Sequence, residues 1–295
     1  MPTYRSRSPK SRWRGATLTA VVAAVFALLM TMTGAATAAS SPSGARIQPG
    51  EAYMGAGTRA HQGGAPGDTA GVITPLSQTD GVQGIDVSHW QGSINWTAVR
   101  NFGIQFAWIK ATEGTSYKDS AFNANYLNAY NAGVIRGAYH FARPDISSGA
   151  TQANYFASNG GAWSRDNLTL PGVLDIEYNP YGATCYGLST SAMRTWITDF
   201  YNTYKARTTR DAVIYSTANW WNTCTGSWTG MATKSPLFVA HYTTATSPTI
   251  PAGWPTWTVW QYTSTGSVSG VAGNVDRDKF NGTRDRLLAL ANNTP

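Results

Sequence analysis

The sequence predicts an α/β protein whose main domain is a modified TIM-like barrel. Eight short runs rich in β-branched and aromatic residues recur after residue 81, and segments with helical character separate the first five of them. Strands and helices in alternation favour parallel βα units, which close most simply as a barrel. The helical pattern ends after Thr217, so we expect loops to join the last three strands, as in a barrel that lacks three helices.

The expected elements follow in chain order. The eight strand candidates are "GIDVSHW", "FAWIKATEG", "VIRGAYHFA", "GVLDIEY", "AVIYST", "PLFVAHYT", "TVWQYTS" and "NVDRD". Two of the helical segments are "SAFNANYLNAYNAG" and "STSAMRTWITDFYNTYKAR", and Ser/Thr residues that can cap a helix precede the second. These elements all lie in residues 81–295, which are long enough to form one hydrophobic core, and we interpret them as a single catalytic domain.

The first 38 residues have the pattern of a secretory signal peptide. Five basic residues precede the apolar run "VVAAVFALLM" (Val21 to Met30), and small residues ending in "ATA" follow it. Ten uninterrupted apolar residues are too few to cross a bilayer, although a retained signal anchor is the alternative. We therefore expect a secreted, extracellular protein with no membrane association after signal cleavage.

The positive charge belongs largely to this signal. Five of the 22 basic residues and none of the 15 acidic ones lie in residues 1–38, so 17 basic residues remain against 15 acidic ones. No Lys/Arg cluster that could contact phosphates is left, which argues against a nucleic-acid partner. We expect the remaining chain to be a monomer.

Only two cysteines occur, Cys185 and Cys224, and both follow the signal. In an exported protein such a pair predicts a disulfide, and closing a loop of this length contributes roughly 3 to 4 kcal/mol in the chain-entropy model. Two cysteines without C-x-x-C spacing and four scattered histidines do not form a metal-ligand cluster, so we expect no metal and no cofactor.

Residues 39–80 differ in composition from the rest of the chain. Of these 42 residues, 27 are Ala, Ser, Pro, Gly or Thr, and large apolar residues are few. Such a composition buries too little surface to offset the entropy of ordering. We interpret the segment as a propeptide or a disordered linker.

Polar residues at the carboxyl ends of the strands are the candidates for an active site, because that end of a barrel carries the catalytic groups. They are Asp86, Glu113, Tyr139, His140, Asp175, Glu177, Tyr215, His241, Gln261, Tyr262 and Asp276. We interpret His89 and His140 as hydrogen-bonded barrel residues. Glu113 either reaches the pocket edge or pairs with Lys110 or Lys118.

The stretch "PGVLDIEYNP" places two acids, Asp175 and Glu177, two positions apart on one strand, so both side chains point to the same face. Carboxyl groups that crowd one another can divide into a protonated acid and an ionised neighbour. Cleavage of a glycosidic bond needs such a pair. A structural pair that accepts hydrogen bonds from loop amides is the alternative, and four acids on the strand ends of one barrel weigh against it.

Five blocks of sequence together resemble glycoside hydrolase family 25, the Chalaropsis-type lysozymes, and in particular their secreted streptomycete members. The blocks are "GIDVSHWQGSINW", "FAWIKATEG", "RGAYHFARP", "PGVLDIEYN" and "GNVDRDKFNG", and the resemblance covers residues 82–290. It implies a (β/α)5(β)3 barrel. It also implies an N-acetylmuramidase that hydrolyses the β-1,4 bond from N-acetylmuramic acid to N-acetylglucosamine in bacterial peptidoglycan, with retention of configuration.

The resemblance also implies roles for individual residues. Glu177 would be the general acid, Asp175 would flank the anomeric centre, and Asp86 and Asp276 would complete the catalytic acidic cluster. Tyr139, Tyr178 and Tyr262 are further candidates for sugar contacts. Two routes stay open: Asp175 attacks the anomeric carbon, or it orients the 2-acetamido group of the substrate, which then attacks. The D-x-E spacing favours the second route slightly.

Three other functions compete with this one. A chitinase-like enzyme or endo-N-acetylglucosaminidase would use the same acids on chitin oligomers. A wall-binding protein without activity could share the barrel, although the four acids argue against it. A wall peptidase or amidase would need a zinc site or a cysteine nucleophile, and the sequence offers neither.

Overall fold

The computed structural model describes residues 47–62 and 81–295, and both ranges belong to one compact unit. The predicted signal peptide and the stretch 63–80 lie outside the described residues. The strands are β1 (Val82–Val87), β2 (Ile104–Glu113), β3 (Tyr117–Lys118), β4 (Ile135–Phe141), β5 (Val173–Asp175), β6 (Val213–Ser216), β7 (Leu237–Ala240), β8 (Val259–Gly266) and β9 (Val275–Phe280). The α-helices are α1 (Ala56–Gln62), α2 (Trp96–Phe102), α3 (Phe122–Asn131), α4 (Gly149–Phe156), α5 (Thr190–Thr208), α6 (Ala218–Thr225) and α7 (Arg284–Asn292).

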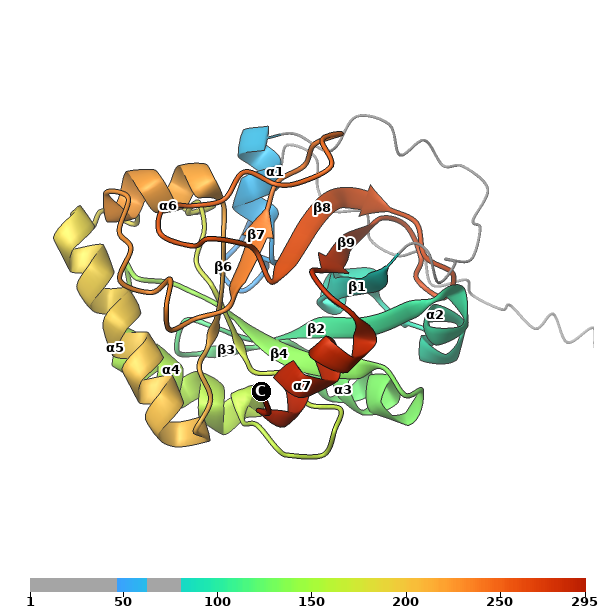
Figure 1. Cartoon of the computed structure of the whole chain (residues 1–295). Helices are drawn as coiled ribbons and strands as arrows, with labels where there is room; N and C mark the ends of the chain where they lie inside the picture. Colours follow the sequence, from blue (N-terminus) through green and yellow to red (C-terminus); the bar gives the residue numbers. More distant parts are fainter. Residues whose placement is uncertain (1–46, 63–80) are drawn as a thin grey trace, which may run out of the picture. The chain divides into compact units, whose positions relative to one another are not determined.

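Eight of these strands close into a barrel. The sheet order is β1-β9-β8-β7-β6-β5-β4-β2-β3, and an additional β1–β2 pairing joins the ends, with β3 outside as a short hairpin partner of β2. Neighbouring barrel strands are parallel except at β9, which runs antiparallel to both β1 and β8. Figure 1 shows α5 and α6 on one side of the strands and α2 and α3 on the other. The predicted α/β barrel and all eight predicted strands are therefore confirmed.

The prediction that helices end after Thr217 is wrong. Helix α6 begins directly after Thr217, whose side chain caps it by accepting a hydrogen bond from the Trp220 amide. Its apolar residues Trp220, Trp221 and Cys224 are buried. The pattern was missed because the helix spans only 8 residues, too few for an apolar periodicity to stand out. With α6, each of the first five barrel strands is followed by a helix.

The last helix, α7, closes the amino end of the barrel (Figure 1). Leu287 and Ala291 of this helix belong to the same buried cluster as Val82 and Val259, the first residues of β1 and β8. A second, larger apolar cluster packs the helices against the outside of the strands. One end of the barrel is therefore sealed by apolar packing, which leaves the carboxyl end of the parallel strands for the site.

Residues 47–62 are ordered against the barrel, so a disordered linker does not describe them. Ala52 and Met54 have no exposed surface, and Met54 belongs to the apolar cluster that fills the barrel interior. The composition of residues 39–80 did not predict this because the barrel supplies the apolar surface that the segment lacks. We call residues 47–62 the inserted segment.

Within the two described ranges, we find no helix that combines the length and the apolar character needed to cross a bilayer.

Candidate active site

The alternation of side chains along β5 places two acids inside the barrel. Val173 belongs to the interior cluster, whereas Leu174 and Ile176 pack in the outer cluster under the helices. Asp175 and Glu177 therefore point inward, and both are fully buried. The sequence prediction that these two side chains share one face is confirmed.

Strands β1 and β9 bring further acids to the same place. Asp86 of β1 lies opposite Asp276 of β9 in the antiparallel register, and Gly84 lies opposite Asp278. All three aspartates are at least 95% buried. Asp278 was missed by the sequence reasoning, although the D-x-D spacing from Asp276 carries the same signal as the D-x-E of β5.

A glutamine from β8 links this cluster to two tyrosines. Gln261 donates from Nε2 to Asp86 Oδ2 at 2.7 Å. Its Oε1 accepts from the hydroxyls of Tyr215 at 2.6 Å and Tyr242 at 2.8 Å. These three bonds fix the amide orientation, so the donor end of Gln261 faces Asp86. Gln261 and Tyr215 were both among the strand-end residues that the sequence singled out.

Burial is the main electrostatic influence on these acids. Desolvation raises the pKa of Asp86 to about 8. The hydrogen bond from Gln261 opposes this rise, and the charge of Glu177 adds to it. Desolvation also raises the pKa of Glu177 to about 7, while hydrogen bonds from Thr58, Gly55 and Gly57 lower it.

The remaining three aspartates follow the same rule. Desolvation and neighbouring carboxylates raise the pKa of Asp175, Asp276 and Asp278 well above the ordinary value. The cluster therefore shares protons at neutral pH and does not carry five negative charges.

Asp175 keeps its hydrogen-bonding capacity unused. Neither of its carboxyl oxygens has a hydrogen-bond partner among the described residues, and both are buried. A buried polar atom without a partner is costly in a folded protein. Asp175 is therefore placed to act on a group that enters the site from outside the chain.

The inserted segment covers Glu177 at the carboxyl end of the barrel strands. The Gly55 amide donates to Glu177 Oε1 at 2.7 Å. The Thr58 amide and hydroxyl both donate to Glu177 Oε2, at 2.7 and 3.0 Å. The positive charge of Arg59 in the segment partly offsets the rise that burial causes in the pKa of Asp276. Glu177 is thus fully engaged by the chain itself.

The other part of the segment lies on Lys110, a buried cation of β2. Lys110 Nζ donates to the carbonyls of Gly50, at 2.9 Å, and Ala52, and it forms an ion pair with Glu113 at 2.8 Å. Glu113 in turn accepts from the Gly50 amide at 2.9 Å. The sequence left two roles open for Glu113, and the structure shows the ion pair with Lys110.

The three predicted sugar-contact tyrosines are placed differently. Tyr139 is in the interior and accepts from the Met54 amide at 3.3 Å. Tyr178 stacks on His61 of the inserted segment with ring centroids 3.9 Å apart. Tyr262 packs with the outer cluster and bonds Gln83. Its neighbour Gln261 takes the inward position, so the structure brings Tyr139 and Tyr178 to the site but not Tyr262.

The histidines singled out in the sequence have structural surroundings. His140 is fully buried between Thr112 and Gln152, at 2.8 and 2.9 Å, and desolvation lowers its pKa to about 4. His89 contacts Asp119 at 2.9 Å. The prediction that both are hydrogen-bonded barrel residues is confirmed.

The predicted disulfide is present between Cys185 and Cys224. It joins the loop after β5, which begins beside Glu177, to helix α6. The bridge therefore anchors the rim of the site to a packed helix.

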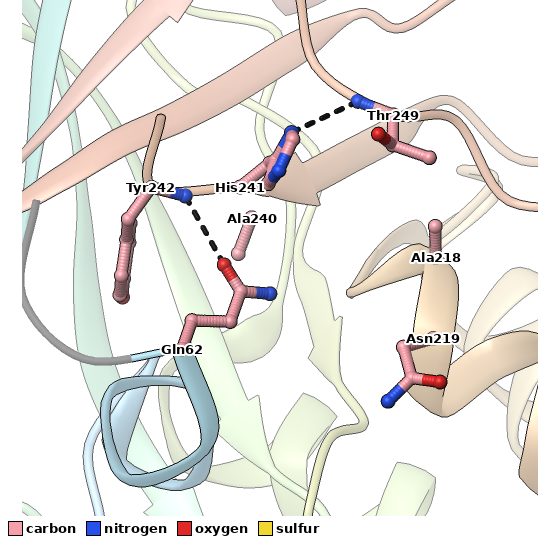
Figure 2. Close-up of a pocket in the computed structure, with 7 residues that line it drawn as sticks. All are labelled: Gln62, Ala218, Asn219, Ala240, His241, Tyr242 and Thr249. Atoms are coloured by element: carbon pink, nitrogen blue, oxygen red, sulfur yellow. Dashed lines mark hydrogen bonds between the residues drawn. The ribbon is translucent and has the colours of Figure 1, made fainter. Parts of the chain in front are cut away.

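Two cavities lie at the ends of the inserted segment. One, of about 390 Å³, is lined by Gln62, Ala218, Asn219, Ala240, His241, Tyr242 and Thr249. In Figure 2 the Gln62 side chain points to the Tyr242 amide, which donates to it at 3.1 Å. The other, of about 430 Å³, is lined by Ile47, Gln48 and Pro49 of the segment and by Pro180, Tyr181 and Gly182 of the barrel. A cavity therefore lies beside each end of the segment, and we call the barrel surface that the segment covers the catalytic depression.

The chain is similar to known proteins along its whole length. The model of glycosyl hydrolases family 25 matches residues 85–271. Lysozyme M1 of Streptomyces globisporus is 64% identical over 295 residues, which is all of both chains. An N,O-diacetylmuramidase of Chalaropsis sp is 42% identical over 213 residues, 71% of this chain and 99% of that protein.

A solved structure resembles the barrel. The bacterial lysozyme from Streptomyces coelicolor is 73% identical with a TM-score of 0.72, and the match covers 73% of this chain and 99% of that one. The family match, the relatives of high identity and the barrel with its acidic cluster agree: the chain belongs to glycosyl hydrolases family 25 and is a glycoside hydrolase.

Proposed function

We propose that this protein is a lysozyme that hydrolyses the β-1,4 bond from N-acetylmuramic acid to N-acetylglucosamine in bacterial peptidoglycan. The observation that carries the proposal is the set of five buried carboxyl groups at the carboxyl end of the barrel, around Glu177 and Asp175. Its relatives include a lysozyme and an N,O-diacetylmuramidase, which supports this choice of substrate.

Glu177 is the general acid of this proposal. A carboxyl group that keeps its proton near neutral pH can protonate the leaving glycosidic oxygen. With the segment in place, burial raises the pKa of Glu177 to about 7. Glu177 in turn raises the pKa of Asp86 and Asp175, so the three carboxyl groups compete for protons. Asp86, Asp276 and Asp278 thereby tune the acid and orient the sugar.

Asp175 acts at the anomeric centre. Its two oxygens have no partner among the described residues, so they are available either to attack the anomeric carbon or to accept the N–H of the 2-acetamido group. We favour the second role, in which the acetamido oxygen attacks and a cyclic oxazolinium ion forms. Both routes involve two inversions and retain the configuration.

Tyr178 and Tyr139 complete the site as contacts to the sugar. In the structure Tyr178 stacks on the ring of His61, and an aromatic face of this kind also suits the apolar face of a pyranose. We further propose that the enzyme is secreted after loss of residues 1–38, works as a monomer outside the cell, and has no membrane association after that step.

The test is the identity of the new sugar end. Because the inserted segment covers Glu177, the assay uses the chain with a recognition sequence for a site-specific protease placed between Gln62 and Gly81, assayed after cleavage. Purified peptidoglycan is digested, reduced with borohydride and analysed by mass spectrometry.

The expected result is the formation of reduced muramic acid ends. In Glu177→Gln their rate of formation should fall by a factor of at least about 10³. Reduced glucosamine ends would contradict the bond assignment and favour an endo-N-acetylglucosaminidase. New amino groups without new sugar ends would exclude glycosidase action. Full activity of Glu177→Gln would remove Glu177 from its role.

A further inference from the structure

The inserted segment occupies the place where a glycan would have to lie. Residues 55 and 58 cover Glu177, Met54 enters the barrel interior, and His61 covers the ring of Tyr178. With the segment in place, Asp175 and Glu177 have no exposed surface. A polysaccharide cannot reach these carboxyl groups without moving the segment.

The contacts between the segment and the barrel are complementary in polarity. Its backbone amides face acceptors of the barrel: Gly50 donates to Glu113, and Ala52 donates to the Tyr181 hydroxyl at 3.1 Å. Its carbonyls face donors, since Trp90 Nε1 donates to the Glu51 carbonyl at 2.8 Å and Lys110 donates to those on either side. Backbone groups of the segment are thus paired with polar side chains of the barrel, as a specific interface requires.

The fit is also steric. A Cβ atom at Gly57 would lie 2.4 Å from the backbone oxygen of Tyr178, and one at Gly55 would lie 2.6 Å from the Tyr242 hydroxyl. Gly55 has a φ of +86°, in the left-handed region that favours glycine. Glycine is therefore the residue that lets the segment approach the barrel at these two positions.

From these contacts we infer that residues 47–62 are an intramolecular inhibitor that binds the catalytic depression in place of the glycan. The inference rests on the proposed function for its assay and goes beyond it by assigning a regulatory role to a segment outside the barrel. The active form then arises when the segment leaves the site. Hydrolysis of a peptide bond between Gln62 and Gly81 by an endopeptidase, which adds one water and leaves a new carboxylate and a new amino terminus, frees it.

The first experiment compares the full chain that carries the protease recognition sequence before and after cleavage, with the released amino-terminal fragment removed by an affinity tag. The rate of new reducing ends from soluble peptidoglycan fragments is expected to rise at least about 10-fold on cleavage. Equal rates before and after cleavage would overturn the inhibitor while leaving the lysozyme assignment intact.

A second experiment displaces the segment without cleavage. Gly57→Ala in the full chain is expected to raise the rate towards that of the cleaved enzyme. Alanine favours a helix over glycine by about 1 kcal/mol, so the helix itself is strengthened and only the contact with Tyr178 is lost. Ala60→Ser, on the exposed side of the same helix, is the matched control and should stay inhibited. Gly55→Ala provides a second displacing variant. A full chain that stays inhibited with both glycine substitutions would contradict the contacts described here.

A third experiment separates inhibition from a role in folding and does not depend on catalysis. A fluorescent peptide of residues 47–62 is titrated with the cleaved enzyme, and binding is followed by anisotropy. A rise in anisotropy that saturates with enzyme concentration is the expected result, and a scrambled peptide should not bind. No binding would overturn the proposal even if the chain proves to cleave another bond.

Discussion

At the scale of single residues, Gln261 links three side chains of the site by hydrogen bonds. It connects Asp86 to the hydroxyls of Tyr215 and Tyr242, all of them buried. Because the two hydroxyls point at its oxygen, the amide nitrogen must face Asp86. A side chain of the same size without the amide would leave the two hydroxyls and a carboxyl group unpaired.

Gln261→Leu is therefore expected to lower the free energy of unfolding by about 2 to 4 kcal/mol. Each buried group left unpaired costs about 1–3 kcal/mol, and rearrangement of the neighbouring side chains recovers part of that cost. Urea unfolding at fixed pH measures the change. Asn123→Leu, on the exposed side of α3, is the control and should change stability by no more than about 0.5 kcal/mol. Equal effects of the two substitutions would show that the amide is not needed.

The same substitution is expected to raise the pKa of Asp86, because the Gln261 hydrogen bond lowers it. Carboxyl ¹³C NMR of the aspartates follows this titration directly. An unchanged Asp86 titration in Gln261→Leu would mean that the bond does not favour the ionised form.

At the scale of elements, the rim of the site depends on α6 and the loop after β5. The disulfide joins Cys185 of that loop to Cys224 of α6, 39 positions apart. Trp220 of α6 adds a second link, since its Nε1 donates to the Thr184 carbonyl at 3.0 Å. The loop that follows Glu177 is thus tied to the helix by a covalent bond and by packing.

The double substitution Cys185→Ala/Cys224→Ala is expected to lower the free energy of unfolding by about 3 to 4 kcal/mol, because the open chain regains the loop entropy that the bond removes. Denaturation with and without a reductant measures it. Reductant should destabilise the native chain by a similar amount and leave the double variant unchanged. A reductant effect on the variant would point to a cause other than this bond.

At the scale of the whole molecule, a barrel that buries five carboxyl groups is sensitive to pH. Asp86 and Glu177 have folded-state pKa values raised to about 8 and about 7, whereas in the unfolded chain both ionise near their ordinary values of 3.8 and 4.5. The folded chain then holds more protons than the unfolded chain, so stability falls as pH rises towards 8. His140 acts in the opposite sense, but only between about pH 4 and 6.5.

We therefore expect the full chain to lose stability from about pH 5 upwards, by about 1.4 kcal/mol per pH unit for each group that is protonated in the folded chain and ionised in the unfolded one, with the contribution of Glu177 ending near pH 7 and that of Asp86 near pH 8. Urea unfolding at a series of pH values measures this slope. Asp86→Asn should reduce the slope up to about pH 8, because the asparagine does not titrate, and should leave the contributions of Glu177 and of the other aspartates in place. A native chain with constant stability across this range would contradict the raised pKa values.

The barrel and most of its acids could be predicted from sequence because both depend on local periodicity. Strand runs and the two-residue spacing of Asp175 and Glu177 are visible in short stretches, and the inward direction follows once a strand is assumed. Helix α6 was missed because its 8 residues carry little periodicity, and Asp278 because the spacing rule was applied to one strand alone. The sequence could not decide which of Gln261 and Tyr262 faces inward, because the face depends on the exact register of β8, which contains irregularities.

The sequence by itself determined which segments form the barrel strands, the family and most of the acids that carry the proposed chemistry, because these follow from patterns within short segments. Only the tertiary structure decided that Gln261 orients Asp86, that Lys110 pairs with Glu113, and that residues 47–62 lie on Glu177. These contacts join positions up to 175 residues apart. A composition rich in Gly and Ala predicts little burial for a segment alone, and its order comes from a surface that a distant part of the chain provides.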